Sequence, residues 1–189
     1  MASNSCYDSG CPLKDSDETP DDSRSDDVVA WQEWSFATMP IEHLYAAITL
    51  RESIFVVEQD VPYLDADGRD PLCHHIAGFV DDQLVAYLRV LPKGLFEPGF
   101  HSFGRVVVHR SRRHAGIGRQ LVARGLAYIN QRQDGVPIKI SSQLYLKDFY
   151  GSFGFEPRGE PYIEDRILHI EMVCDRSGAT APSLSRRRQ

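Results

Sequence analysis

The segment from Val106 to Arg132 restricts the fold more than any other part of the sequence. Val106, Val107 and Val108 are typical of a buried strand, and a basic loop with two glycines follows them. Apolar residues then recur at the spacing of an amphipathic helix: Ile117, Leu121, Val122, Leu126 and Ile129. A strand that passes through a short loop directly into a helix indicates a fold in which helices pack on a sheet.

Strand-like and helix-like stretches alternate through the rest of the chain. A helix is expected from Ile41 to Phe55 and a short one from Leu144 to Phe153, and residues 60–72 form a polar loop. Strands are expected at 28–36, 73–80, 83–91, 102–109 and 136–142, with further strands beginning at Phe155 and at Ile167. Asp81-Asp82 separates two of these runs and predicts a hairpin. The order predicts an α/β (α+β) fold with a mixed central sheet flanked by helices.

The net charge of −6 is concentrated at one end of the chain. Residues 1–30 hold eight acidic and two basic residues, so the remainder is balanced. The composition of residues 1–27, rich in Ser, Asp, Gly and Pro, predicts a disordered acidic tail. Residues 175–189 are small and polar and end in Arg186-Arg187-Arg188-Gln189, which predicts a disordered basic tail rather than a nucleic-acid site. One domain is expected over residues 28–174.

Composition also predicts the compartment. No apolar run exceeds five residues, and no basic segment precedes a hydrophobic stretch, so we expect neither a transmembrane helix nor a secretory signal, and no membrane partner. The four cysteines are irregularly spaced and lack the pairing of a zinc site or of a disulfide-rich secreted domain. A cytoplasmic protein without a metal is therefore expected.

The loop before residue 117 has the composition of an anion site. Gly116 and Gly118 let the backbone approach a ligand closely, and the free amides and dipole of a helix N-terminus favour a pyrophosphate there. Nearby arginines (112, 113 and 119) add positive charge. The loop lacks the Lys-Ser/Thr of a Walker A motif, and Leu121 replaces the last glycine of a dinucleotide fingerprint.

Two motifs in the expected order resemble the GNAT superfamily of N-acetyltransferases. The first is Arg113-x-x-Gly116-x-Gly118, and the second is the segment Phe149-Tyr150-Gly151-Ser152-Phe153-Gly154-Phe155. The ElaA-like branch is indicated by further residues across positions 33–174: Leu50-Arg51, Ile54–Gln59, Pro62-Tyr63, Asp65, Asp67, His75, Gln143, Tyr162, Glu164-Asp165 and His169-Ile170. The resemblance implies the GNAT-type acyl-CoA N-acyltransferase fold, with six to seven strands.

The resemblance also implies a reaction. Acetyl-CoA would be the cosubstrate, and a primary amine of a small molecule or peptide would attack its thioester directly. Tyr150 corresponds to the tyrosine that acts as general acid on the leaving thiolate. The cofactor-binding residues implied are Val106, Val107, Val108, Arg113, His114, Ala115, Gly116, Ile117, Gly118, Arg119, Gln143 and Tyr150. Gln143 stands near the position where many relatives have an asparagine.

The sequence does not identify the general base. The central strand offers no carboxylate, and the candidates are Glu58 and His75, with His74 and the acids of the 65–70 loop as alternatives. Each has a structural alternative, since acids in a loop are common turn residues and adjacent strand residues point apart. The same divergence argues against a metal site at Cys73-His74-His75.

Two other functions compete with an N-acetyltransferase. Arg51, Phe55, Glu58 and the aspartates after them are similar to acyl-homoserine-lactone synthases, although those enzymes generally lack the Arg-x-x-Gly-x-Gly loop. The second competing function is that of a non-catalytic acyl-CoA-binding or sensor domain. The acceptor is not identified, and the oligomeric state is open between a monomer and a homodimer.

Overall fold

The computed structural model describes residues 28–176. The predicted acidic tail, residues 1–27, lies outside the described residues, as does the predicted basic tail except for Asp175 and Arg176. Arg176 is anchored to the domain, because its Nη1 donates to Asp134 Oδ1 at 3.1 Å and to the Val136 carbonyl at 3.3 Å. The packed part of the chain therefore extends two residues past the expected boundary at 174.

Four antiparallel strands form the first sheet, in the order β1-β2-β3-β4. They are β1 (Ala30–Ser35), β2 (His74–Val80), β3 (Gln83–Leu91) and β4 (Ser102–Val108). The predicted hairpin is confirmed: Asp81 and Asp82 have φ of 49° and 60°, the conformation of a two-residue turn that matches strand twist. Strands β2 and β3 are buried along most of their length, so this sheet is covered on both faces.

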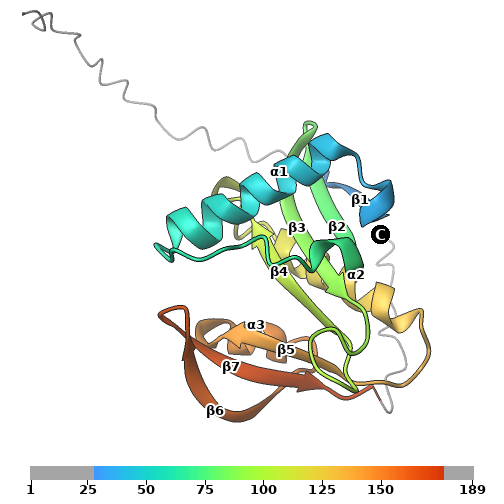
Figure 1. Ribbon diagram of the computed structural model, residues 1–189, viewed down its shortest axis with the longest axis vertical. Helices are drawn as coiled ribbons and strands as arrows, with labels where there is room; N and C mark the ends of the chain where they lie inside the picture. The colour runs from blue at the N-terminus through green and yellow to red at the C-terminus, as the bar shows by residue number, and fades with distance from the viewer. Residues whose placement is uncertain (1–27, 177–189) are drawn as a thin grey trace, which may run out of the picture.

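A second antiparallel sheet follows in the chain, in the order β5-β7-β6. It contains β5 (Ile138–Gln143), β6 (Glu156–Glu164) and β7 (Ile167–Cys174). A parallel bridge between His101 and Ile138 joins the two sheets at one point, where the His101 amide donates to Pro137 and its carbonyl accepts from Lys139. The α/β class and the number of strands are confirmed, and the predicted central sheet is divided into two sheets that lie apart beyond this bridge (Figure 1).

Helices cover both faces of the first sheet. Helix α1 (Ile41–Glu52) packs Ala47 and Leu50 against Ala77 and Tyr87, whereas α2 (Ile117–Asn130) packs on Ile76, Ala86 and Leu88 on the opposite face. Adjacent strand residues thus serve opposite helices, as the period of two requires. Helix α3 (Lys147–Gly151) lies between β5 and β6 in the chain. No helix within residues 28–176 is long and apolar enough to cross a membrane.

The first helix ends differently from the prediction. The expected helix from Ile41 to Phe55 is α-helical only to Glu52, and Ser53–Glu58 forms a π-helical turn. Such turns are uncommon and concentrate at functional sites. This turn carries Phe55 and Glu58 toward the part of the first sheet where β4 is irregular.

Candidate active site

A β-bulge interrupts β4 in the middle of the strand. Gly104 lies opposite Arg89 and Val107 opposite Tyr87, so Arg105 and Val106 together face a single residue of β3. Arg105 adopts a φ of 54°, which a residue with a side chain rarely adopts and which the bulge requires. The bulge re-aims the strand so that Val106 lines a cavity, whereas the side chain of Val107 stays buried under α1.

The loop before α2, where an anion site is predicted, presents backbone amides without partners. The backbone amides of residues 114–118 donate no hydrogen bond to any other residue of the described chain. His114 and Gly116 have φ of 67° and 78°, so successive amides turn toward one side at the start of α2. A Cβ built on Gly116 would meet no atom within 4 Å, so the space beside Gly116 is open.

The arginines of this loop contact protein groups. Arg113 forms a two-pronged ion pair with Glu58 at 2.7 and 2.9 Å and donates from Nε to the Val108 carbonyl. Arg119 donates to Ser152 Oγ at 2.9 Å and lies over the Phe153 ring. The Arg113 side chain therefore holds the π-helical turn against the anion loop, a contact that the sequence does not indicate.

A cavity of about 260 Å³ lies where the two sheets separate. The predicted residues Val106, Gln143 and Tyr150 line it together, although they come from β4, β5 and α3. Tyr150 is 5% exposed, and no group of the described residues forms a hydrogen bond with its hydroxyl. Burial raises the pKa of Tyr150, so the phenol stays protonated at neutral pH.

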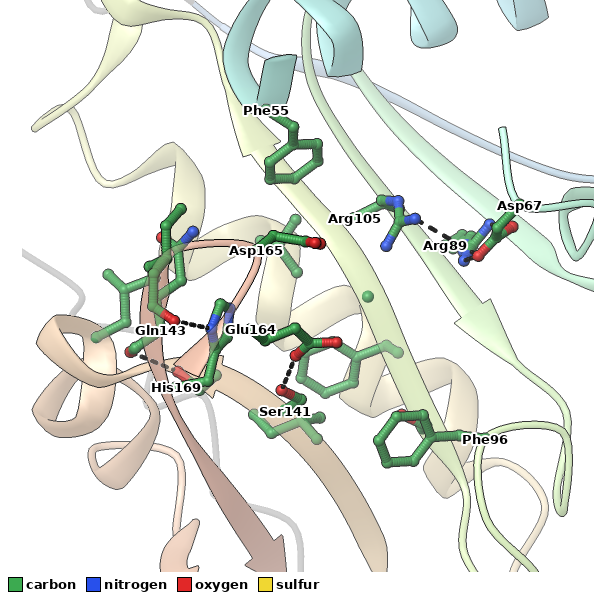
Figure 2. A pocket seen from close by; sticks show the side chains of 18 of the residues that line it. Phe55, Asp67, Arg89, Phe96, Arg105, Ser141, Gln143, Glu164, Asp165 and His169 are labelled. Atoms are coloured by element: carbon green, nitrogen blue, oxygen red, sulfur yellow. Dashed lines mark hydrogen bonds and ion pairs between the residues drawn. The ribbon is translucent and has the colours of Figure 1, made fainter. Parts of the chain in front are cut away.

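Side chains without an assigned role form the opposite wall of this cavity. Glu164, Asp165 and His169 come from the end of β6, the following turn and β7, and they face Arg105 across the cavity (Figure 2). Ser141 Oγ donates to Glu164 at 3.1 Å, and His169 Nδ1 lies 2.9 Å from the Ile167 carbonyl. The sequence indicated these residues only through the family resemblance, because nothing local to β6 and β7 links them to Tyr150.

The two candidate bases lie away from this cavity. Neither Glu58 nor His75 is among its lining residues. Hydrogen bonding from Arg113 lowers the pKa of Glu58. His75 is fully buried between the Tyr87 hydroxyl at 2.7 Å and the Asp70 carbonyl at 3.1 Å, and burial lowers its pKa. Their role as a base stays a prediction, and the carboxylates that line the cavity are those of Asp67, Glu164 and Asp165.

Residues 73–75 point in different directions. Cys73 donates to the Arg69 carbonyl, and burial raises the pKa of its thiol to about 11. His74 stacks on Tyr128 with ring centroids 3.7 Å apart. Within residues 28–176, no group of three or more His, Cys, Asp or Glu is arranged to hold a metal ion.

A cluster of buried and partly buried charges ties the 60–72 loop to the first sheet. Its arginines come from α1, β3 and β4, and its aspartates all come from the loop. We call it the arginine-aspartate cluster; its members are Arg51, Arg89, Arg105, Asp65, Asp67 and Asp70. Three positive and three negative charges compensate one another, as burial requires.

The arginine-aspartate cluster has short contacts throughout. Arg51, with no exposed surface, lies 2.7 Å from Asp65 and 3.0 Å from Asp70. Arg89 lies 2.7 Å from Asp70 and binds Asp67 with both terminal nitrogens. Arg105, in the bulge, lies 2.7 Å from Asp65. The cluster therefore joins the loop, the bulge and the first helix into one unit beside the cavity.

Comparison with known proteins agrees with this geometry. Residues 69–176 match the family model described as "Acetyltransferase (GNAT) domain". The protein ElaA of Escherichia coli is 38% identical over 149 residues, which is 77% of this chain and 96% of that protein. Its crystal structure superposes with a TM-score of 0.73 at 37% identity, covering 78% of this chain and 100% of that one.

Two further solved structures are informative. An acyl-CoA N-acyltransferase from Pseudomonas aeruginosa has a TM-score of 0.73 at 37% identity, covering 78% of this chain and 99% of that one. The acyl-homoserine-lactone synthase LasI has a TM-score of 0.64 at 14% identity, covering 79% of this chain and 91% of that one. The second likeness concerns the fold alone.

Replacing Arg51 should destabilise the protein strongly. We expect Arg51→Met to lower the free energy of unfolding by about 3 kcal/mol, because it leaves Asp65 and Asp70 buried with one cation fewer. Urea denaturation followed by circular dichroism measures this change. Arg158→Met is the matched control, since Arg158 is half exposed and its ion pairs exceed 3.6 Å. Equal stability of the two variants would contradict the role given to the cluster.

Acid should weaken the same cluster. Burial by itself would raise the pKa of Asp67 and Asp70, but hydrogen bonds from Arg89 and the nearby guanidinium charges outweigh it and lower both. Asp67 and Asp70 contribute fully to the free energy of unfolding above the pKa of about 3.9 that an aspartate has in the unfolded chain. This contribution is lost as the pH falls from there through the lower pKa values of the folded state. Urea midpoints measured from pH 5 down to pH 2 should fall; a constant midpoint would contradict this.

Proposed function

Because the chain belongs to the GNAT acetyltransferase family, we propose that it transfers the acetyl group of acetyl-CoA to a primary amine of a small molecule or peptide. The family implies acyltransferase activity with a coenzyme A thioester as donor. The proposal rests on one observation above the others. Tyr150, whose hydroxyl bonds no group of the described residues, lines the same cavity as the bulge of β4, and the loop and first turn of α2 carry the free amides of residues 114–118.

The donor would be held by the backbone. The free amides of residues 114–118 and the positive end of the α2 dipole suit the pyrophosphate of coenzyme A. The pantetheine arm would lie along β4 beside Val106 and Val108, where the bulge separates the strand from regular pairing. A backbone amide there can donate to the thioester carbonyl oxygen and stabilise the charge that develops on it.

Tyr150 suits the role of general acid. When the amine nitrogen attacks the thioester carbon, a C–N bond forms and the C–S bond breaks, with the electron pair leaving on sulfur. The protonated phenol donates its proton to this thiolate. The aromatic rings of Phe103, Phe149 and Phe155 lie 5.0–6.2 Å from the Tyr150 ring and keep its surroundings apolar.

Donor binding is tested by blocking the anion loop. Gly116→Val should weaken acetyl-CoA binding tenfold or more, measured by calorimetry, because a side chain would occupy the open space beside this residue and strain the positive φ. Gly135→Val is the matched control: Gly135 also has a positive φ (64°) and open surroundings but is not adjacent to the loop. Unchanged affinity in Gly116→Val would remove this loop from the donor site.

Catalysis is tested by removing one oxygen atom. Tyr150→Phe should lower kcat about 100-fold with acetyl-CoA affinity unchanged, because the leaving thiolate loses its proton donor. Free thiol release is assayed against polyamines, aminoglycosides, amino sugars, amino acids and peptides, with Tyr145→Phe, an exposed neighbour, as control. Acetyl-CoA binding without thiol release from any amine would instead support a non-catalytic acyl-CoA-binding domain.

A further inference from the structure

The cavity lining holds three arginines and three carboxylates, but their charges are unevenly distributed. Arg89, Arg105 and Asp67 belong to the arginine-aspartate cluster, whose charges sum to zero. Glu164 and Asp165 form no ion pair with any described residue. Arg69, on the exposed loop, is the one further charged group among the lining residues. The lining outside the cluster is therefore net negative, and the unpaired carboxylates gather on the wall formed by the second sheet (Figure 2).

Glu164 is held in place from its own sheet. The Ser141 hydroxyl donates to its carboxylate at 3.1 Å and shares a hydrogen bond of 2.6 Å with the Tyr162 hydroxyl. Asp165 and Arg166 have φ of 48° and 65°, so β6 and β7 join through a tight two-residue turn. This turn sets the two carboxylates at the cavity, and Ser141 orients the first of them.

Tyr150 independently marks the reacting end of the same cavity. Its side chain is more than nine-tenths buried and its hydroxyl bonds no group of the described chain, so the hydroxyl is available to a group that enters the cavity. In the proposed function that group is the donor sulfur. The acceptor nitrogen must approach the adjacent thioester carbon, and the wall that carries Glu164 is one part of the cavity open to it.

Building on the proposed function, we propose that the acceptor is a primary amine of net positive charge, such as an alkyl diamine, and that Glu164 binds its reacting ammonium and takes its proton. The neutral amine then attacks the thioester, the C–N bond forms and the C–S bond breaks. Tyr150 gives its proton to the leaving sulfur. As the amide forms, the nitrogen loses a second proton, and this proton restores the Tyr150 phenol. Asp165 faces the other positive charge of the acceptor.

Acceptor binding tests this directly. The full-length protein is titrated by calorimetry with 1,4-diaminobutane in saturating coenzyme A, and with ornithine, which is the same diamine bearing a carboxylate. We expect diaminobutane to bind more tightly than ornithine. Glu164→Gln should weaken diaminobutane binding at least fivefold, because a charged hydrogen bond becomes neutral. Glu160→Gln, an exposed residue of the same strand that does not line the cavity, should leave it unchanged.

A pH profile separates proton transfer from binding alone. In the wild type, kcat/KM for diaminobutane should fall at acid pH as a carboxylate becomes protonated. Glu164→Gln should lose this acid limb and Glu160→Gln should keep it. Retention of the limb in Glu164→Gln would overturn the assignment of the base.

The two proposals fail in different ways. Absence of coenzyme A binding would refute the proposed function. In that case 1,4-diaminobutane is titrated into the protein alone, and this titration still tests whether Glu164 binds a diamine. If the protein binds coenzyme A, three results would overturn the inference and leave the proposed donor site unaffected. They are no binding of diaminobutane up to about 10 mM, equal affinities for diaminobutane and ornithine, and equal diaminobutane affinities of the wild type and Glu164→Gln.

Discussion

The arginine-aspartate cluster is the interaction on which the site depends. The 60–72 loop has little regular structure, and Val61 is its one buried apolar residue, so hydrophobic packing contributes little to its position. The three aspartates of the cluster are held instead by guanidinium groups from α1, β3 and β4. A buried charge without its partner is strongly unfavourable. If one of these elements moved, charges on the other elements would lose their partners, so the cluster fixes their relative positions. Arg105 belongs both to this cluster and to the bulge, which couples the loop to the strand that would hold the donor.

The division of the strands into two sheets creates the cavity. One parallel bridge at His101 and Ile138 joins them, and the His101 side chain reinforces it with a hydrogen bond to Asp134 at 2.7 Å. Past the bridge, β4 and β5 separate, and side chains from both sheets line the space between them. The charges on the first-sheet side belong to the arginine-aspartate cluster and neutralise one another, whereas Glu164 and Asp165 on the second sheet have no ion-pair partner among the described residues. In the proposed function, this asymmetry would separate a donor side that uses backbone amides from an acceptor side that uses carboxylates.

Much of the local structure could be predicted, because local patterns carry it. The hairpin at Asp81-Asp82, the valine strand and the helix after Gly118 follow from spacing and turn chemistry within short segments. The π-helical turn after Glu52 could not, since its pattern continues that of an ordinary helix. Glu58 and His75 were candidates for a base because they are titratable and match the family pattern. Their contacts with Arg113 and Tyr87 come from residues distant in sequence, which no local pattern reports.

The family, the order of the elements and the glycine-containing loop at the start of α2 can be recognised from the sequence, because each depends on residues close together in the chain. Only the tertiary structure decided which carboxylates share a cavity with Tyr150. Glu164 reaches it because β6 pairs with β7, β7 pairs with β5, and the second sheet lies apart from the first. The physical reason is that electrostatic and hydrogen-bonding roles depend on distance in space and on burial, and both are set by strand pairing between segments far apart in the sequence.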